Sequence, residues 1–322
     1  MPGASARPHA ERIRAALQDG SAVHSAIAAS WRRSALLHGL DPEARAARQA
    51  LASAELRQVR DAMGPLVELA QPVMDRLFQA VGGIGCCVVL TDERGVLVER
   101  RGAGGEDRQF RDWGLWTGAV WSEAREGTNA IGTCLAEGRP LTVHRDQHFQ
   151  ARNALLSCTT APVYDHEGRL AAALDVSSAR RDLTEGMTAL IAASVAEAAR
   201  RIEERCFRQA FPRARIVLAD DRTAGALLAI DADDLVVGAS RSARQALGIT
   251  AARLRRPLPA ADVLGAGEAE AAPPALAQAE RGALQRALAR AGGNVSAAAE
   301  ALGISRATLH RKLRRLGLRG GG

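Results

Sequence analysis

A short segment near the C-terminus concentrates side chains that carry positive charge or form hydrogen bonds. These residues are Ser305, Arg306, Thr308, Arg311, Lys312, Arg314 and Arg315. From Leu276 to the last residue, nine arginines and lysines stand against two acids, so this segment carries a net charge of +7, equal to that of the whole chain. A basic excess confined to one segment indicates a polyanionic partner. We expect double-stranded DNA; the alternative is a solvated charged tail.

The spacing of apolar residues predicts how this segment folds. Apolar residues recur at helical spacing from Leu276 to Ala291 and again from Val295 to Leu302. Gly303 permits a tight turn, and Ser305 is suited to cap a third helix that runs to about Leu316. Two helices joined by a tight turn form the helix-turn-helix layout, whose second helix enters the major groove of DNA.

The third helix has an apolar side and a basic side. At about 100° per residue, Leu309 and Leu313 point to the core, whereas Arg311 and Arg314 point away from it. Arg306 lies in the first turn, where recognition helices present side chains to base edges. The remaining basic residues, which are Arg311, Lys312, Arg314 and Arg315, are suited to phosphates.

A second group of candidate residues lies in the middle of the chain, where three of its four tryptophans fall within nine residues. An indole combines apolar bulk with an N–H donor, which suits a small polar ligand. The candidate ligand-binding residues are Trp113, Trp116, Trp121, Asn129, Phe149 and Cys158. The alternative is that these are ordinary core or lid residues.

Histidines and cysteines offer little further chemistry. His144 and His148 have a spacing that would bind a metal on one helix face, but no second histidine pair accompanies them, and we expect solvated or hydrogen-bonded histidines and no metal or cofactor. The five cysteines form no CxxC pair, which fits a reducing cytoplasm. Cys86 and Cys87 are adjacent on an expected strand, so one should face the core and the other the surface.

The middle of the chain alternates short apolar runs with turn signals, which predicts an α+β fold with helices on one face of an antiparallel sheet. The expected strands are Ile84–Thr91, Val96–Glu99, Pro140–Val143, Thr159–Tyr164 and Leu170–Val176, and a long helix is expected over Leu183–Phe207.

Several stretches resemble one family of bacterial regulators. GNVSAAAEALGISRATLHRKLRRLGL resembles the Fis-type helix-turn-helix. WSEAREGTNAIGTCLAEGRPLTV, followed by DQHF, SCTTAPVYDHEGRL and LDVSS, resembles the GAF domain of acetoin-catabolism activators, and IAASWRRSALLHGLDP resembles the leader of that family. LLAIDADDLVVGASRSARQALGI resembles the opening of a PAS domain.

The resemblance implies a domain order and a set of contacts. The expected parts are a helical leader at 1–75, a GAF-like sensor at 76–208, a truncated PAS-like segment at 209–264, a linker at 265–275 and an all-α helix-turn-helix at 276–322. It implies that Arg306 reads a base and that Ser305, Thr308, Arg311 and Lys312 contact base edges or phosphates. It also implies a homodimer and an effector that is acetoin-like or an alcohol.

One expected domain of that family is missing. Such activators carry an ATPase between sensor and helix-turn-helix, but a P-loop needs GxxxxGK[ST]. The only lysine of this chain is Lys312, inside the recognition helix. We therefore expect neither ATPase activity nor unaided opening of a sigma-54 promoter.

The function expected from the sequence is a ligand-responsive transcriptional regulator that is not an enzyme. Two alternatives remain, an architectural DNA-binding protein and a GAF-domain cysteine enzyme. The N-terminus has no apolar region of the signal-peptide type, and no run approaches the roughly 20 apolar residues of a membrane span, so we expect a cytoplasmic protein without a membrane partner.

Overall fold

The structure is a computed structural model that describes residues 6–18, 25–44, 48–219, 223–264 and 276–318. The chain divides into two compact units. The first unit comprises residues 1–165 and 169–206, and the second comprises 166–168 and 207–322. The linker expected at 265–275 lies outside the described residues.

The first unit is built on a five-stranded sheet with the order β2-β1-β5-β4-β3, in which all neighbours are antiparallel. Its strands are β1 (Cys86–Asp92), β2 (Leu97–Arg101), β3 (Leu141–His144), β4 (Ser157–Tyr164) and β5 (Leu170–Ser178). The central strands β1, β4 and β5 are almost entirely buried, which explains why their sequences are continuous apolar or small-residue runs.

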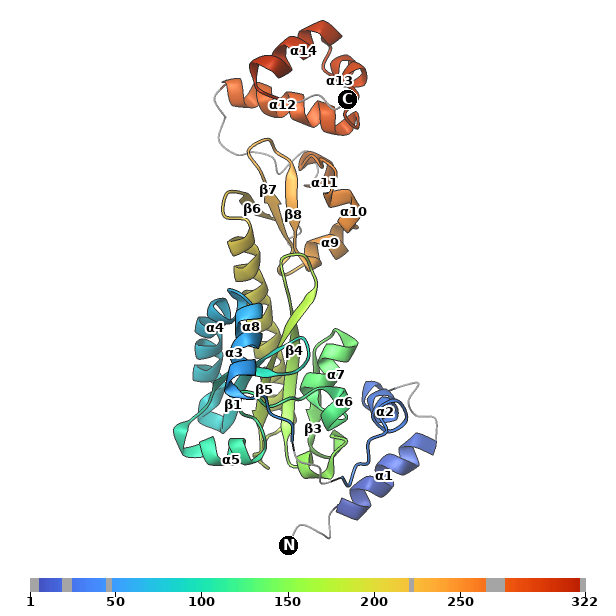
Figure 1. Cartoon of the computed structure of the whole chain (residues 1–322), viewed down its shortest axis with the longest axis vertical. Helices are drawn as coiled ribbons and strands as arrows, with labels where there is room; N and C mark the ends of the chain where they lie inside the picture. The colour runs from blue at the N-terminus through green and yellow to red at the C-terminus, as the bar shows by residue number, and fades with distance from the viewer. Residues whose placement is uncertain (1–5, 19–24, 45–47, 220–222, 265–275, 319–322) are drawn as a thin grey trace. The chain divides into compact units, whose positions relative to one another are not determined.

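Helices cover both faces of this sheet, whereas the sequence predicted helices on one face only. The helices of the first unit's body are α3 (Ser53–Ala62), α4 (Leu66–Val81), α5 (Asp107–Asp112), α6 (Glu123–Glu126), α7 (Ala130–Glu137) and α8 (Glu185–Ala210), of which the last four residues belong to the second unit. Within this unit, Figure 1 shows α4 and α8 on one side of the sheet and α6 and α7 on the other. One core joins α4 and α8 to the sheet through residues such as Met74 and Val195, and a second core joins α5 and α7 to the opposite face through Phe110 and Ile131.

The two-sided cover corrects the expectation for the adjacent cysteines. Cys86 and Cys87 do point to opposite faces of β1, because Cys86 belongs to the first core and Cys87 to the second. Both are fully buried, so neither reaches the surface. A sheet with helices on one face would have exposed Cys87.

The N-terminal leader packs against the sensor. It comprises α1 (Ala6–Gln18), α2 (Ala26–Arg32) and a π-helical turn over Arg33–Leu37. Ser30 Oγ donates to Thr128 Oγ1 at 2.7 Å, and Trp31 Nε1 donates to the Gln147 carbonyl at 2.7 Å. Arg33 forms a two-pronged ion pair with the buried Glu123, at 2.7 and 3.1 Å. The leader therefore contributes to the stability of the first unit.

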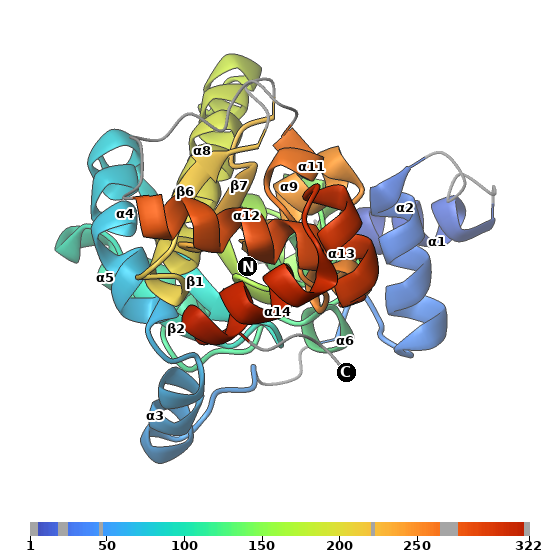
Figure 2. The same cartoon turned by 90° about the horizontal axis from the view of Figure 1, so that it is seen from above.

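The second unit begins with a small antiparallel sheet of order β6-β7-β8. Its strands are β6 (Arg215–Leu218), β7 (Leu227–Ile230) and β8 (Val236–Ala239), followed by the short helices α9 (Arg241–Leu247), α10 (Ala251–Leu254) and α11 (Ala261–Leu264). The C-terminal part contains α12 (Leu276–Arg290), α13 (Val295–Ala301) and α14 (Arg306–Arg315), which pack around one small core (Figure 2).

Candidate functional site

The turn between α13 and α14 is fixed by local hydrogen bonds. Asn294 Oδ1 accepts from the backbone N–H groups of Ser296 and Ala297 at 3.0 and 3.2 Å and so caps α13. Gly303 adopts φ +64°, a conformation that favours glycine. Ser305 Oγ accepts from the Thr308 N–H at 3.1 Å, which starts α14 at Arg306. The sequence therefore specifies both helix starts and the turn.

Packing of α14 against α12 and α13 determines which side of α14 is exposed to solvent. Leu309 and Leu313 are buried against Leu284 of α12 and Ala298 of α13. The side chains on the outer face are exposed, namely Arg306, Ala307, Arg311 and Arg314. Among the described residues, no carboxylate lies within ion-pair distance of these three arginines. The exposed face of α14 thus presents guanidinium groups beside a small residue.

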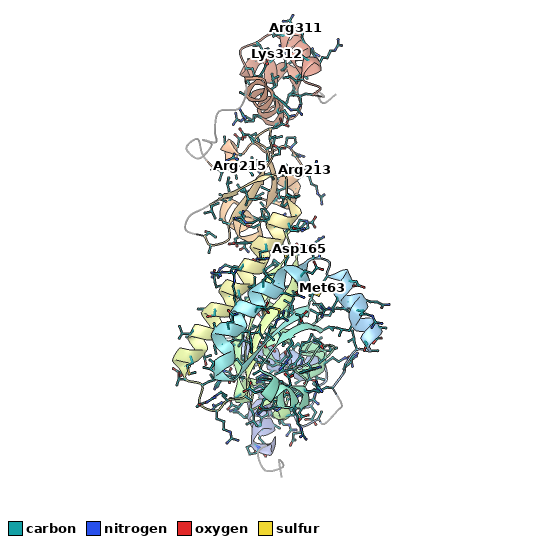
Figure 3. The ribbon with its side chains drawn as sticks, turned by 90° about the vertical axis from the view of Figure 1, so that its left-hand side faces the viewer. Met63, Asp165, Arg213, Arg215, Arg311 and Lys312 are labelled. Atoms are coloured by element: carbon teal, nitrogen blue, oxygen red, sulfur yellow. The ribbon has the colours of Figure 1, made fainter. Side chains whose placement is uncertain are left out.

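Two of the predicted DNA contacts are already engaged by an acid. Lys312 and Arg315 both donate to the carboxylate of Glu280 on α12. Lys312 is half-buried, and its hydrogen bond holds the pKa of Glu280 below its usual value. Figure 3 shows Lys312 next to Arg311 on this helix. Of the seven residues predicted from sequence, Ser305 and Thr308 therefore shape the helix start, and Lys312 and Arg315 join α14 to α12.

The first unit has a cavity that is open to the surface beside two of the candidate tryptophans. It has a volume of about 590 Å³, within the usual range for a small-molecule site. Its lining includes Trp113 and Trp116, which follow α5, and three arginines that come from separate parts of the chain: Arg48, Arg111 and Arg152. Trp113 is edge-on to the buried Phe110, with ring centroids 6.3 Å apart, so the core holds one wall in place.

Trp116 is held by cation–π contacts. The guanidinium carbon of Arg111 lies 4.1 Å from its ring centroid and that of Arg100 lies 4.6 Å away. Arg100 is itself paired with Asp107 at 2.7 Å, whereas Arg111 is exposed and lies at the cavity.

Arg48 is a half-buried lining residue of the cavity. Its Nη2 donates to Asn153 Oδ1 at 2.6 Å, but its buried Nη1 has no hydrogen-bond acceptor among the described residues. Burial lowers the pKa of Arg48 to about 10, and the nearby positive charge of Arg152 adds to this effect. Glu126, whose negative charge opposes this shift, accepts hydrogen bonds from Arg152 at 2.7 Å and from Asn153 at 3.2 Å.

The other four candidate ligand residues do not line this cavity. Trp121 is buried beneath it and donates from Nε1 to the Gly114 carbonyl at 2.8 Å. Asn129 caps α7, because its Oδ1 accepts from the Gly132 N–H at 2.8 Å. Phe149 packs against Ile13 and Trp31 of the leader, and Cys158 is buried in β4. Sequence reasoning missed the lining arginines, since only the tertiary fold brings residues 48, 111 and 152 together.

The histidines and cysteines have structural surroundings. His144 Nδ1 is 2.8 Å from Ser157 Oγ, and His148 Nδ1 is 2.9 Å from the Arg145 carbonyl. Burial lowers the pKa of His148 to about 4. No group of three potential metal ligands occurs within the described parts of the chain. Burial raises the pKa of all five thiols, which keeps them protonated and poorly nucleophilic.

Across the described helices, none combines the length and apolar character required to span a bilayer.

Comparison with known proteins agrees with this architecture. Residues 65–202 match the GAF domain family, and residues 275–316 match the family described as bacterial regulatory protein, Fis family. The acetoin catabolism regulatory protein of Cupriavidus necator is 35% identical over 236 residues, covering 71% of this chain and 35% of that protein. The acetoin dehydrogenase operon transcriptional activator of Bacillus subtilis is 27% identical over 159 residues, covering 49% of this chain and 26% of that protein.

The chain thus spans well under half of the length of these two relatives, at 35% and 26%. The solved structure of the Escherichia coli DhaR(N)–DhaL complex superposes with a TM-score of 0.50 at 18% identity, covering 70% of this chain and 77% of that one, which shows a shared fold. The chain therefore combines a GAF domain with a helix-turn-helix of the bacterial Fis family and is related in sequence to acetoin catabolism regulators.

Proposed function

We propose that this protein is a cytoplasmic transcriptional regulator that binds operator DNA and responds to a small molecule held by its GAF domain. The observation that carries the proposal is the basic outer face of α14. Arg306, Arg311 and Arg314 are exposed there, opposite the buried Leu309 and Leu313. A capped helix with this distribution, preceded by a glycine turn, suits entry into the major groove.

The active form is a homodimer. A single helix-turn-helix covers one half-site, and two recognition helices reach successive major grooves only when they are held about 34 Å apart. A second copy of the chain supplies the second helix. The two relatives carry names of a regulator and an activator, which supports transcriptional control as the outcome of DNA binding.

The effector site is the cavity beside Trp113 and Trp116. Its volume suits a small organic molecule, and its walls join apolar indole surface to a few charged groups, as ligand sites commonly do. Of the remaining candidates, Trp121 contacts the lining residues Gly114 and Arg48, whereas Asn129, Phe149 and Cys158 have structural roles elsewhere in the first unit.

DNA binding is tested by selecting an operator in vitro and comparing two variants. Arg306→Ala should weaken the operator by about 1–3 kcal/mol while affecting random DNA little, because a base contact carries discrimination. Arg314→Ala should weaken both DNAs alike, as expected for a phosphate contact. Arg108→Ala, on an exposed position of α5, is the control and should change neither affinity. Equal losses on both DNAs for Arg306→Ala would show that Arg306 does not read a base.

A further inference from the structure

The cavity beside Trp116 is more basic than a site for a neutral ligand requires. Its charged lining residues are Arg48, Arg111, Arg152 and one acid, Asp112. Glu126 forms an ion pair with Arg152 at 2.7 Å and so neutralises the charge of that arginine. After these two acids are counted against the three arginines, the positive charge still exceeds the negative.

Arg48 carries donor capacity that the protein leaves unused. Its Nη1 has no acceptor among the described residues, although Nη2 is bound by Asn153. The guanidinium lies directly against the backbone of Gly114, where an added Cβ would come within 2.6 Å of Nη1. Its carbon is 5.2 Å from the Trp121 ring, so aromatic contact holds the group in place without neutralising it. Among the described residues, no carboxylate pairs with this half-buried guanidinium, and a ligand anion at this wall would compensate its charge.

Arg111 supplies a second cation from another segment. It stacks on Trp116 at 4.1 Å and lines the same cavity. Within the described residues, no carboxylate forms an ion pair with it. The indoles of Trp113 and Trp116 also line the cavity and add apolar surface, which inorganic anions cannot use.

We propose that this cavity binds a small organic monocarboxylate, with Arg48 and Arg111 holding the carboxylate and Trp113 and Trp116 contacting the apolar body of the ligand. The inference rests on the proposed effector role of the cavity and names the chemical class of the effector. A neutral alcohol or ketone would not need this site, because a guanidinium group without an anionic partner binds a neutral ligand no better than an amide or a hydroxyl does. Guanidinium groups pair with carboxylates through charge-assisted hydrogen bonds, which are about twice as strong as neutral ones.

The test is calorimetric titration of the full-length protein with matched ligand probes. Benzoate and butyrate are compared with benzamide and butyramide, which keep the shape and lose the charge, and with inorganic phosphate, which keeps the charge and loses the apolar body. At least one carboxylate should bind about tenfold or more tightly than its amide. Arg111→Gln should remove most of that preference, and Arg48→Gln should do the same.

Variants of matched chemistry separate binding from folding. Arg108→Gln, on the same helix α5 but outside the cavity lining, should leave carboxylate affinity unchanged. Arg48→Lys should restore part of the preference lost in Arg48→Gln, because the charge returns without the planar fork. The proposal is overturned if no carboxylate of the panel binds, if amides bind equally well, if phosphate binds as tightly as benzoate, or if Arg111→Gln has no effect.

A separate DNA titration distinguishes this inference from the proposed function. Carboxylate binding that leaves operator affinity unchanged would support the site and contradict its regulatory role. An operator response to acetoin in a protein that ignores every carboxylate would support the regulatory role and overturn the site.

Discussion

At the scale of single residues, the sensor core contains one buried acid whose ionisation opposes folding. Asp175 lies on β5, fully buried, and accepts hydrogen bonds from Thr160 Oγ1 and Ser177 Oγ, each at 2.5 Å. Burial raises the pKa of Asp175 to about 6 despite these two bonds. The titratable side chains that interact with it are the buried thiols Cys86, Cys87, Cys134 and Cys158, whose own pKa values are raised, so they stay neutral in this range.

Asp175 should therefore make stability fall as pH rises through the acid range. Its folded pKa of about 6 lies above the reference value of 3.8, so the unfolded chain releases this proton first. The loss in the free energy of unfolding accumulates between about pH 4 and pH 6, reaches on the order of 3 kcal/mol, and is constant above. Asp175→Asn removes this loss, so the stability difference between variant and wild type should grow in favour of the variant across that window.

Urea unfolding followed by tryptophan fluorescence measures the effect, because all four tryptophans lie in the first unit. Asp61→Asn, an exposed position on α3, is the control and should leave the pH profile unchanged. Parallel profiles for wild type and Asp175→Asn would mean that Asp175 does not titrate in this range.

Glu280 forms ion pairs with two basic side chains of α14, Lys312 and Arg315. Glu280→Gln removes the acceptor of Lys312 and Arg315 and leaves both free to approach phosphates. Affinity for random DNA should rise, and the dependence of log K on log salt should steepen by up to about two, since each added phosphate contact contributes about 0.9. Glu300→Gln, at an exposed position of α13, makes the same change in net charge and should have the smaller effect. Equal effects of the two variants would show that Glu280 affects DNA binding only through the net charge of the protein and not through its ion pairs with Lys312 and Arg315.

At the scale of elements, α7 shows how close packing fixes the segment EGTNAIG. Asn129 caps the helix, and Gly132 lies in its first turn against the preceding loop. A Cβ on Gly132 would come within 2.3 Å of the Glu123 backbone nitrogen, a contact that only a backbone shift relieves. The segment is therefore explained by helix packing, without a ligand.

Gly132→Ala should destabilise the first unit by about 1–3 kcal/mol, the usual cost of an overpacked contact. Gly83→Ala is the matched control, because an added Cβ there meets nothing within 4 Å. Thermal unfolding of the two variants followed by tryptophan fluorescence should give a lower Tm only for Gly132→Ala. A Tm for Gly132→Ala equal to that of the control would show that α7 can move at no cost.

The elements also show what a sequence can predict and what it leaves open. The expected strand Leu170–Val176 is observed as Leu170–Ser178, and the helix expected over Leu276–Ala291 is observed as Leu276–Arg290. These expectations succeeded because short apolar runs, periodicity and caps are local signals. The cover on the second face of the sheet was missed, since it is made by helices of only four to eight residues between β2 and β3, and the apolar pattern of so short a helix does not show which face of a sheet it covers.

The cavity could not be found from sequence for a different reason. Two of its tryptophans were noticed because indoles are rare in this chain, but arginines are common and carry no such signal. The lining arginines at 48, 111 and 152 meet only through the tertiary fold, and nothing local distinguishes them from arginines at the surface. Pairing with Glu280 was missed in the same way, because it joins α12 to α14 across the helical core.

At the scale of the whole molecule, regulation requires that binding of the effector changes the free energy of DNA binding. An effector changes operator affinity only by its differential affinity for the DNA-binding and non-binding forms, and such couplings commonly lie between 5- and 150-fold, or about 1–3 kcal/mol. Two copies are needed to present two recognition helices, so the arrangement of the dimer is the property that the effector must alter.

We therefore expect a homodimer whose operator affinity shifts by roughly 5–150-fold when the GAF cavity is filled. Light scattering at micromolar protein with operator DNA tests the first part, and a monomer on the DNA would contradict it. Titration of operator with and without a ligand proven to bind the cavity tests the second. Trp116→Ala provides the control, since it removes a cavity wall far in sequence from α14 and should abolish the shift while leaving ligand-free DNA binding intact. Identical operator affinities with and without bound ligand would favour an architectural DNA-binding protein, because such a protein dimerises through its sensor region and gains no regulation from it.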